Sequence, residues 1–135
     1  MGKVSDNEMI MFAAEFARTV AEVDEDLLYD VALLFGESRK SYFSLESILY
    51  APASESANLV YKVASSIDEY TEDKECVGIL FCEGFLYEML YSYSGHGYGG
   101  EDAKKLHDAL YDLSARHGMW FEWGDGRINM QVCDN

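Results

Sequence analysis

The chain has 135 residues, of which 49% are apolar and 14% aromatic, which suits one domain over residues 1–135 and excludes a disordered chain. Twenty-five acidic against ten basic side chains give a formal net charge of −15, spread along the chain rather than gathered in a tail. Nucleic acids and anionic membranes are bound through lysine and arginine, so this charge argues against both as direct partners. A basic protein surface is the natural complement, and simple solubility is the alternative reason for the acidity.

The cysteine and histidine positions indicate neither a disulfide framework nor a metal site. Cys76 and Cys82 lie six residues apart in an apolar stretch, where a free cysteine behaves as a small hydrophobe. The three histidines, His96, His107 and His117, match no metal-binding spacing. The N-terminus lacks the apolar run of a signal peptide. We therefore predict a cytoplasmic protein without cofactor or metal.

Residues 5–23 are predicted to form an amphipathic helix. Ser5 followed by Glu8 is a capping-box pattern, which marks a helix N-terminus. Apolar side chains recur after it at helical spacing, and charged ones take the other side. The apolar set is Met9, Phe12, Ala13, Phe16, Val20 and Val23.

Three more helices are predicted before the most apolar stretch of the chain. They cover residues 25–35, 44–50 and about 54–70. The first has apolar residues at helical spacing and a capping acid, Asp24, in front of it. Gly36 stands where a left-handed C-cap belongs, and Pro52, the only proline, ends the second.

Residues 76–93 form the most apolar stretch, with thirteen apolar residues in eighteen. A segment that is apolar on every side needs cover on every side, so it is predicted to be the central element of the core. Its length favours a buried helix; the alternative is a strand over residues 76–82 followed by a helix over 83–93. Glu83 and Glu88 argue against a membrane span.

The last third of the chain predicts a helix and a hairpin. The helix covers residues 101–117 and follows a glycine-rich loop at 94–100. Asp125–Gly126 is a hairpin turn signal between two alternating segments, in which Met119, Phe121 and Trp123 share a face with Ile128, Met130 and Val132. The predicted fold is therefore α+β: a mainly helical single domain of five to six helices around a buried central helix, with a C-terminal β-hairpin.

No motif predicts catalysis. The glycine-rich loop precedes a helix, as a phosphate-binding loop does, but it lacks the Walker spacing, and Glu101 and Asp102 would repel phosphate. No serine has the G-x-S-x-G context of a nucleophile. The order of helix and hairpin matches a winged helix, but the acidic residues on both argue against DNA binding.

Two acidic clusters are the candidate binding residues. The first comprises Glu22, Asp24, Glu25, Asp26 and Asp30, and the second comprises Asp68, Glu69, Glu72, Asp73 and Glu75. In the predicted helices the first cluster places Asp26 four residues before Asp30, and the second places acids at a helix end; neither arrangement stabilises a helix. An ordinary solvated surface is the alternative. Aromatic anchors for a partner would be Tyr98, Trp120 and Tyr29.

These features predict a non-enzymatic, acidic protein-binding inhibitor that occupies a basic surface of a partner. Its carboxylates would stand where the phosphates of a nucleic acid would lie. Phage anti-defence proteins, such as anti-CRISPR proteins, and toxin-immunity proteins are the classes that such a protein fits, by charge and size and not by motif. One alternative is a small-molecule binder or enzyme with a pocket near residues 76–100, using Glu83, Glu88 and His96. Another is a structural subunit of a larger assembly.

Overall fold

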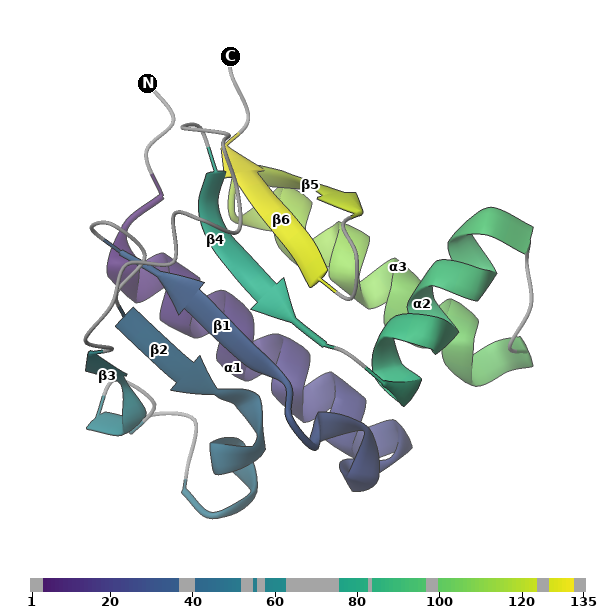
Figure 1. Ribbon diagram of the computed structural model, residues 1–135, viewed down its shortest axis with the longest axis horizontal. Helices are drawn as coiled ribbons and strands as arrows, with labels where there is room; N and C mark the ends of the chain where they lie inside the picture. The colour runs from purple at the N-terminus through teal and green to yellow at the C-terminus, as the bar shows by residue number, and fades with distance from the viewer. Residues whose placement is uncertain are drawn as a thin grey trace.

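The computed structural model describes residues 4–36, 41–51, 55, 58–62, 76–82, 84–96, 100–123 and 127–132. In these residues three α-helices accompany one six-stranded antiparallel sheet (Figure 1). The helices are α1 (Asp6–Val23), α2 (Phe85–His96) and α3 (Gly100–Arg116). The strands are β1 (Ala32–Phe35), β2 (Ser41–Ser44), β3 (Tyr61–Lys62), β4 (Cys76–Phe81), β5 (Met119–Trp123) and β6 (Arg127–Val132).

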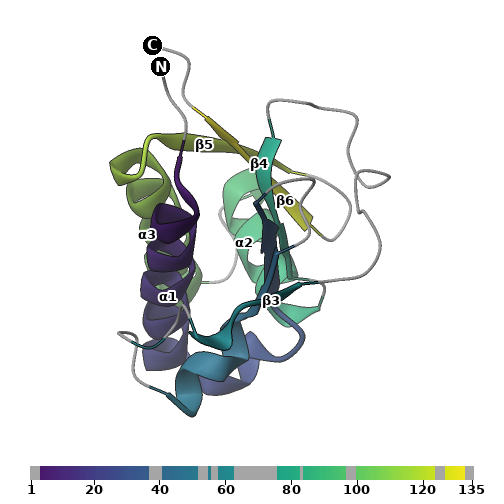
Figure 2. The ribbon, with the colours of Figure 1, turned by 90° about the vertical axis from the view of Figure 1, so that its left-hand side faces the viewer.

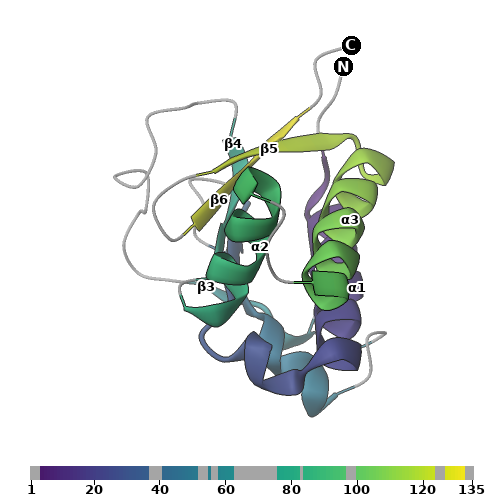
Figure 3. The same ribbon diagram turned by 90° about the vertical axis from the view of Figure 1, so that its right-hand side faces the viewer.

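The strands lie in the order β3-β2-β1-β4-β6-β5. Figures 2 and 3 show α1 and α3 side by side on one side of this sheet. The core lies between them and the sheet, where Phe12 and Phe16 of α1 and Leu33 and Leu80 of the central strands are fully buried. No helix within the described ranges combines the length and the apolar content that crossing a membrane requires.

The prediction of five to six helices around a buried central helix is wrong. The structure has three α-helices in its described part, and the centre of the fold is strand β4, between β1 and β6. The alternative order, a strand followed by a helix, is what residues 76–93 adopt. Gly84 separates the two with φ of +106°, a backbone conformation that side-chain-bearing residues rarely adopt.

The predicted helix over residues 25–35 is also wrong. The segment forms a short 3₁₀-helix, η1 (Glu25–Leu28), and then β1. All four residues of β1 are buried, so its apolar side chains cover both faces of a strand instead of one helical stripe. A short apolar run of this kind does not distinguish a strand from a buried helix by its periodicity.

Three further segments differ from the prediction in their type or their bounds. Residues 44–50 contain a 3₁₀-helix, η3 (Leu45–Leu49), in place of an α-helix. Tyr61–Lys62, inside the helix predicted over residues 54–70, forms β3, and the rest of that prediction lies largely outside the described residues. The loop predicted over 94–100 is shorter, because α2 continues to His96 and α3 begins at Gly100.

The two strongly periodic helices and the hairpin are confirmed. The hydroxyl of Ser5 accepts a hydrogen bond from the backbone N–H of Glu8 at 3.2 Å and so caps α1. In the hairpin Met119 is buried, whereas Trp120 and Glu122 are exposed, as the alternation requires. Phe121 pairs with Met130 and Trp123 with Ile128 across the two strands, and β6 in turn pairs with β4.

Candidate functional site

The first acidic cluster lies in the turn that joins α1 to β1. All five of its carboxylates are exposed. Glu22 is in the last turn of α1, Glu25 and Asp26 begin η1, and Asp30 lies just before β1. Asp26 and Asp30 do not take the i,i+4 arrangement expected for a helix, because the segment forms a short 3₁₀-helix, η1, that ends at Leu28.

Two members of the cluster have partners within the chain. Asp24 joins α1 to η1: its backbone N–H donates to the carbonyl of Val20 at 2.9 Å, and its carboxylate accepts from the N–H of Asp26 at 3.0 Å. Glu22 lies 3.6 Å from the Lys105 ammonium of α3. These two acids therefore stabilise the junction and the helix pair. Among the described residues, the carboxylates of Glu25, Asp26 and Asp30 have no such partner.

Asp26 and Asp30 line a surface hollow together with the start of α2. Its other lining residues are Leu27, Tyr29, Gly84, Phe85 and Leu86, and its volume is about 480 Å³. We call it the acidic hollow. Two chain segments far apart in sequence form it: the turn after α1 and the first residues of α2. Asp30 has φ of 58° there, a left-handed conformation that aspartate tolerates better than most residues.

The acidic hollow combines exposed aromatic rings with unpaired carboxylates. Tyr29 is 71% exposed and Phe85 is 80% exposed, whereas Leu27 and Leu86 are buried at its base. Among the described residues that line it, none is a lysine, arginine or histidine. Among the residues whose side chains the structure describes, none forms an ion pair with Asp26 or Asp30. Such a site suits a ligand that is positively charged and partly apolar.

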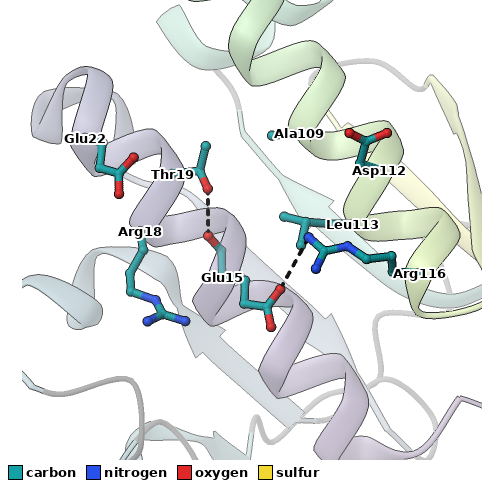
Figure 4. Close-up of a pocket in the computed structure, with 8 residues that line it drawn as sticks. All are labelled: Glu15, Arg18, Thr19, Glu22, Ala109, Asp112, Leu113 and Arg116. Atoms are coloured by element: carbon teal, nitrogen blue, oxygen red, sulfur yellow. Dashed lines mark hydrogen bonds and ion pairs between the residues drawn. The ribbon is translucent and has the colours of Figure 1, made fainter.

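A second hollow, drawn in Figure 4, lies between α1 and α3. We call it the paired-charge groove. Its volume is also about 480 Å³. Its lining residues are Glu15, Arg18, Thr19, Glu22, Ala109, Asp112, Leu113 and Arg116.

Two of the three acids that line the paired-charge groove, Glu15 and Glu22, have a cation of the same chain beside them. The guanidinium of Arg116 lies 3.8 Å from the carboxylate of Glu15, and Lys105 lies 3.6 Å from Glu22 (Figure 4 shows the first pair). Both pairs connect α1 with α3, with residue numbers rising in one helix as they fall in the other, so the helices are antiparallel. These exposed pairs connect the two helices and neutralise two of the acids that line the groove.

The structure separates Trp120 from the acidic turn. Trp120 is 41% exposed on β5. In Figures 2 and 3, β5 lies at one end of the molecule and the C-terminal end of α1 lies at the other. Trp120 is therefore no part of the acidic hollow. The second predicted cluster, Asp68, Glu69, Glu72, Asp73 and Glu75, and the predicted anchor Tyr98 lie outside the described residues.

Of the segment 76–100, in which a small-molecule pocket was predicted, the residues Gly84, Phe85 and Leu86 at the start of α2 line the acidic hollow. Glu88 is exposed and lines neither hollow, and Glu83 lies outside the described residues. His96 ends α2, but its side chain is not among those described. Within the described part of the chain, no three His, Cys, Asp or Glu side chains are arranged to hold a metal ion.

An aromatic cluster that the sequence analysis did not identify joins α2, α3 and the hairpin. The imidazole of His107 lies between two tyrosine rings, with centroids 4.9 Å from Tyr93 and 4.6 Å from Tyr111. Tyr111 then contacts Phe121 at 4.7 Å, and Phe121 contacts Trp123 at 5.5 Å. These offset and edge-on contacts are the favoured aromatic geometries and fix the two helices to β5.

Phe85 is the site residue that the sequence analysis missed. It stood inside a stretch that was expected to be buried throughout, yet it is one of the most exposed apolar residues. A helix beginning at Phe85 buries Leu86 and Leu90, four residues apart, on one face and turns Phe85 away from that face. Recognising the strand–helix break at Gly84 would have identified it.

Comparison of the chain with protein-family models, with curated proteins and with solved structures finds no match in any of the three.

Proposed function

We propose that the protein acts without catalysis, by binding a basic surface of another protein in its acidic hollow. One observation supports this most strongly. Two exposed aromatic residues, Tyr29 and Phe85, and two carboxylates, Asp26 and Asp30, line one concavity. In the part of the chain that the structure describes, no cation pairs with these carboxylates and no basic residue lines the concavity.

The two kinds of side chain would contribute differently to binding. Aromatic residues at the centre of an interface supply much of its binding energy, because burying each ring removes a large apolar area from water. Carboxylates mainly raise the association rate and select a partner of opposite charge. The net charge of −15 extends this attraction beyond the contact itself.

The kind of partner is inferred from the acidity of the chain. A basic surface that normally binds nucleic acid would match the acidity best, because the carboxylates would then compete with phosphates. Inhibition of such a protein, as phage anti-defence and toxin-immunity proteins perform it, is the role we propose. The cytoplasm is the compartment that we propose for it, because the spacing of its cysteines indicates no disulfide framework.

The test compares three immobilised proteins as baits in lysate of the source cells. They are the natural protein, the double variant Asp26→Lys, Asp30→Lys, and a control with Asp112→Lys and Glu122→Lys. Both double variants raise the net charge by the same amount, and all four positions are exposed. Proteins retained at low and at high salt are identified by mass spectrometry, and binding is then measured with each purified candidate.

A basic protein retained by the natural protein and the control, but lost by the Asp26–Asp30 variant and at high salt, is the expected result. Equal retention by all three baits would refute the acidic hollow as the binding site.

A further inference from the structure

The base and walls of the acidic hollow are largely apolar. Leu27 and Leu86 are buried, and the rings of Tyr29 and Phe85 stand beside them. A lysine ammonium is a compact, strongly hydrated charge, which loses much of its hydration in such surroundings. A guanidinium is delocalised and more weakly hydrated, so it enters partly apolar surroundings at a smaller desolvation penalty.

The two aromatic rings come from different elements and are both accessible. Tyr29 follows η1 directly, and Phe85 is the first residue of α2. With exposed fractions of 71% and 80%, both rings have accessible surface on which a planar cation can stack. Arginine stacks on aromatic faces more often than lysine does.

The two carboxylates suit a forked donor. Asp26 and Asp30 lie on either side of Tyr29 in the sequence and line the same hollow. A guanidinium carries five N–H donors in one plane, so it can bond two carboxylates or bond one in a bidentate manner. Lysine presents its three donors from a single nitrogen, without that planar geometry.

The start of α2 leaves space for such a group. Gly84 lines the hollow, and a Cβ atom added to it would meet no atom within 4 Å. The volume of about 480 Å³ exceeds what one side chain needs. We therefore infer that the acidic hollow binds an arginine side chain of the partner, with the guanidinium between Asp26 and Asp30 and stacked on Tyr29 or Phe85; this inference rests on the proposed function.

Two pentapeptides that differ in one residue test this inference. They are acetyl-Gly-Gly-Arg-Gly-Gly-amide and the same peptide with lysine in place of arginine. Each is titrated into ¹⁵N-labelled protein at low salt, and the amide signals of Tyr29, Asp30 and Phe85 are followed. We expect the arginine peptide to shift these signals with a dissociation constant at least about three-fold below that of the lysine peptide.

Single variants then locate the contact. Tyr29→Ala or Phe85→Ala is expected to lower the affinity for the arginine peptide about two- to five-fold, which is the range of an exposed cation–π contact. Tyr50→Ala, which removes a ring that is 80% exposed and lines neither hollow, serves as the control and leaves the affinity unchanged. Because Phe85 is the more exposed of the two rings, its variant keeps the test valid even if Tyr29→Ala perturbs the fold.

The outcomes separate the inference from the proposed function. Equal dissociation constants for the two peptides, with shifts at the acidic hollow, would overturn the arginine preference and leave binding of a basic partner standing. Shifts confined to amides away from the acidic hollow, for both peptides, would overturn both.

Discussion

The acidic hollow and the paired-charge groove have the same volume, about 480 Å³, and both contain two or more carboxylates. They differ in what stands beside those carboxylates. In the groove Glu15 has Arg116 at 3.8 Å. In the acidic hollow no described cation pairs with Asp26 or Asp30. Two exposed aromatic residues line this hollow together with them.

The two hollows differ in the pairing of their charges, and for this reason we propose the acidic hollow, and not the groove, as the binding surface. Glu22 illustrates this point. It belongs to the first acidic cluster in the sequence, yet it lines the paired-charge groove and lies 3.6 Å from Lys105. An acid that already has a cation in its own chain gains less from a basic partner than an unpaired acid does.

The largest expected effect is on the free energy of unfolding, and it differs between two neighbouring residues of the acidic hollow, Phe85 and Leu86. Leu86→Ala removes a side chain that is 1% exposed and should lower the free energy of unfolding by about 2–5 kcal/mol, because it leaves a cavity in the core. Phe85→Ala should change it by no more than about 0.5 kcal/mol, because this ring lies at the surface. Urea denaturation measures both. A loss of stability in Phe85→Ala equal to that of Leu86→Ala would show that the ring is part of the core.

The next effect concerns the charge of the acidic hollow. Once a partner is purified, Asp26→Lys with Asp30→Lys should weaken its binding by about ten-fold or more, chiefly through slower association. Surface plasmon resonance at several salt concentrations measures this rate. The control variant, Asp112→Lys with Glu122→Lys, should keep most of the affinity, because neither residue lines the acidic hollow. Equal losses in both variants would mean that only net charge matters.

A smaller expected effect concerns the pKa of Tyr42 in strand β2, to which Asp30 contributes. Burial, and then the neighbouring Tyr61, raise the pKa of Tyr42 above its model-compound value of 10.0, and the charge of Asp30 raises it slightly further. The unfolded state therefore deprotonates first, so this contribution to stability is complete below pH 10 and is lost as the pH rises through the pKa of the folded state.

Measurement of unfolding between pH 9 and 12 checks the role of Tyr42. Tyr42→Phe should reduce the fall in stability above about pH 10, since phenylalanine does not ionise. Asp30→Asn should lower the pKa of Tyr42, as followed by NMR titration. An unchanged alkaline profile in Tyr42→Phe would contradict the assignment.

The smallest effect is expected in the paired-charge groove. A double-mutant cycle of Glu15→Ala and Arg116→Ala should give a coupling free energy of about 0.2–1 kcal/mol, as is usual for exposed ion pairs. Binding of the partner should not change in either single variant. A loss of partner affinity in these variants would place the groove, too, in the interface.

The parts of the fold that the sequence predicts are those with local signals. Helix α1 has a capping serine and a regular apolar stripe, and α3 has the same periodicity. The sequence of the hairpin has an Asp–Gly pair, a turn signal, between two alternating segments. These signals act between residues close in sequence, so they operate before any tertiary contact forms.

The central strands lack such signals, because their burial comes from distant elements. In β1 all four residues are buried, and in β4 a Cβ on Gly78 would lie 2.6 Å from the side chain of Met9 in α1. An apolar run that is buried on two faces by other segments has no characteristic periodicity of its own. Only the assembled sheet decided that these runs are strands.

The same division holds for the candidate site. The sequence alone gives the acidity and the cluster around Asp26 and Asp30, because composition and local charge do not depend on the fold. It also predicts Tyr29 as an anchor for a partner. The tertiary structure decided that Glu22 would pair across α1 and α3 and that Phe85 would stand exposed beside Tyr29. Such pairings depend on where distant segments meet, and that position is set by the packing of the whole core.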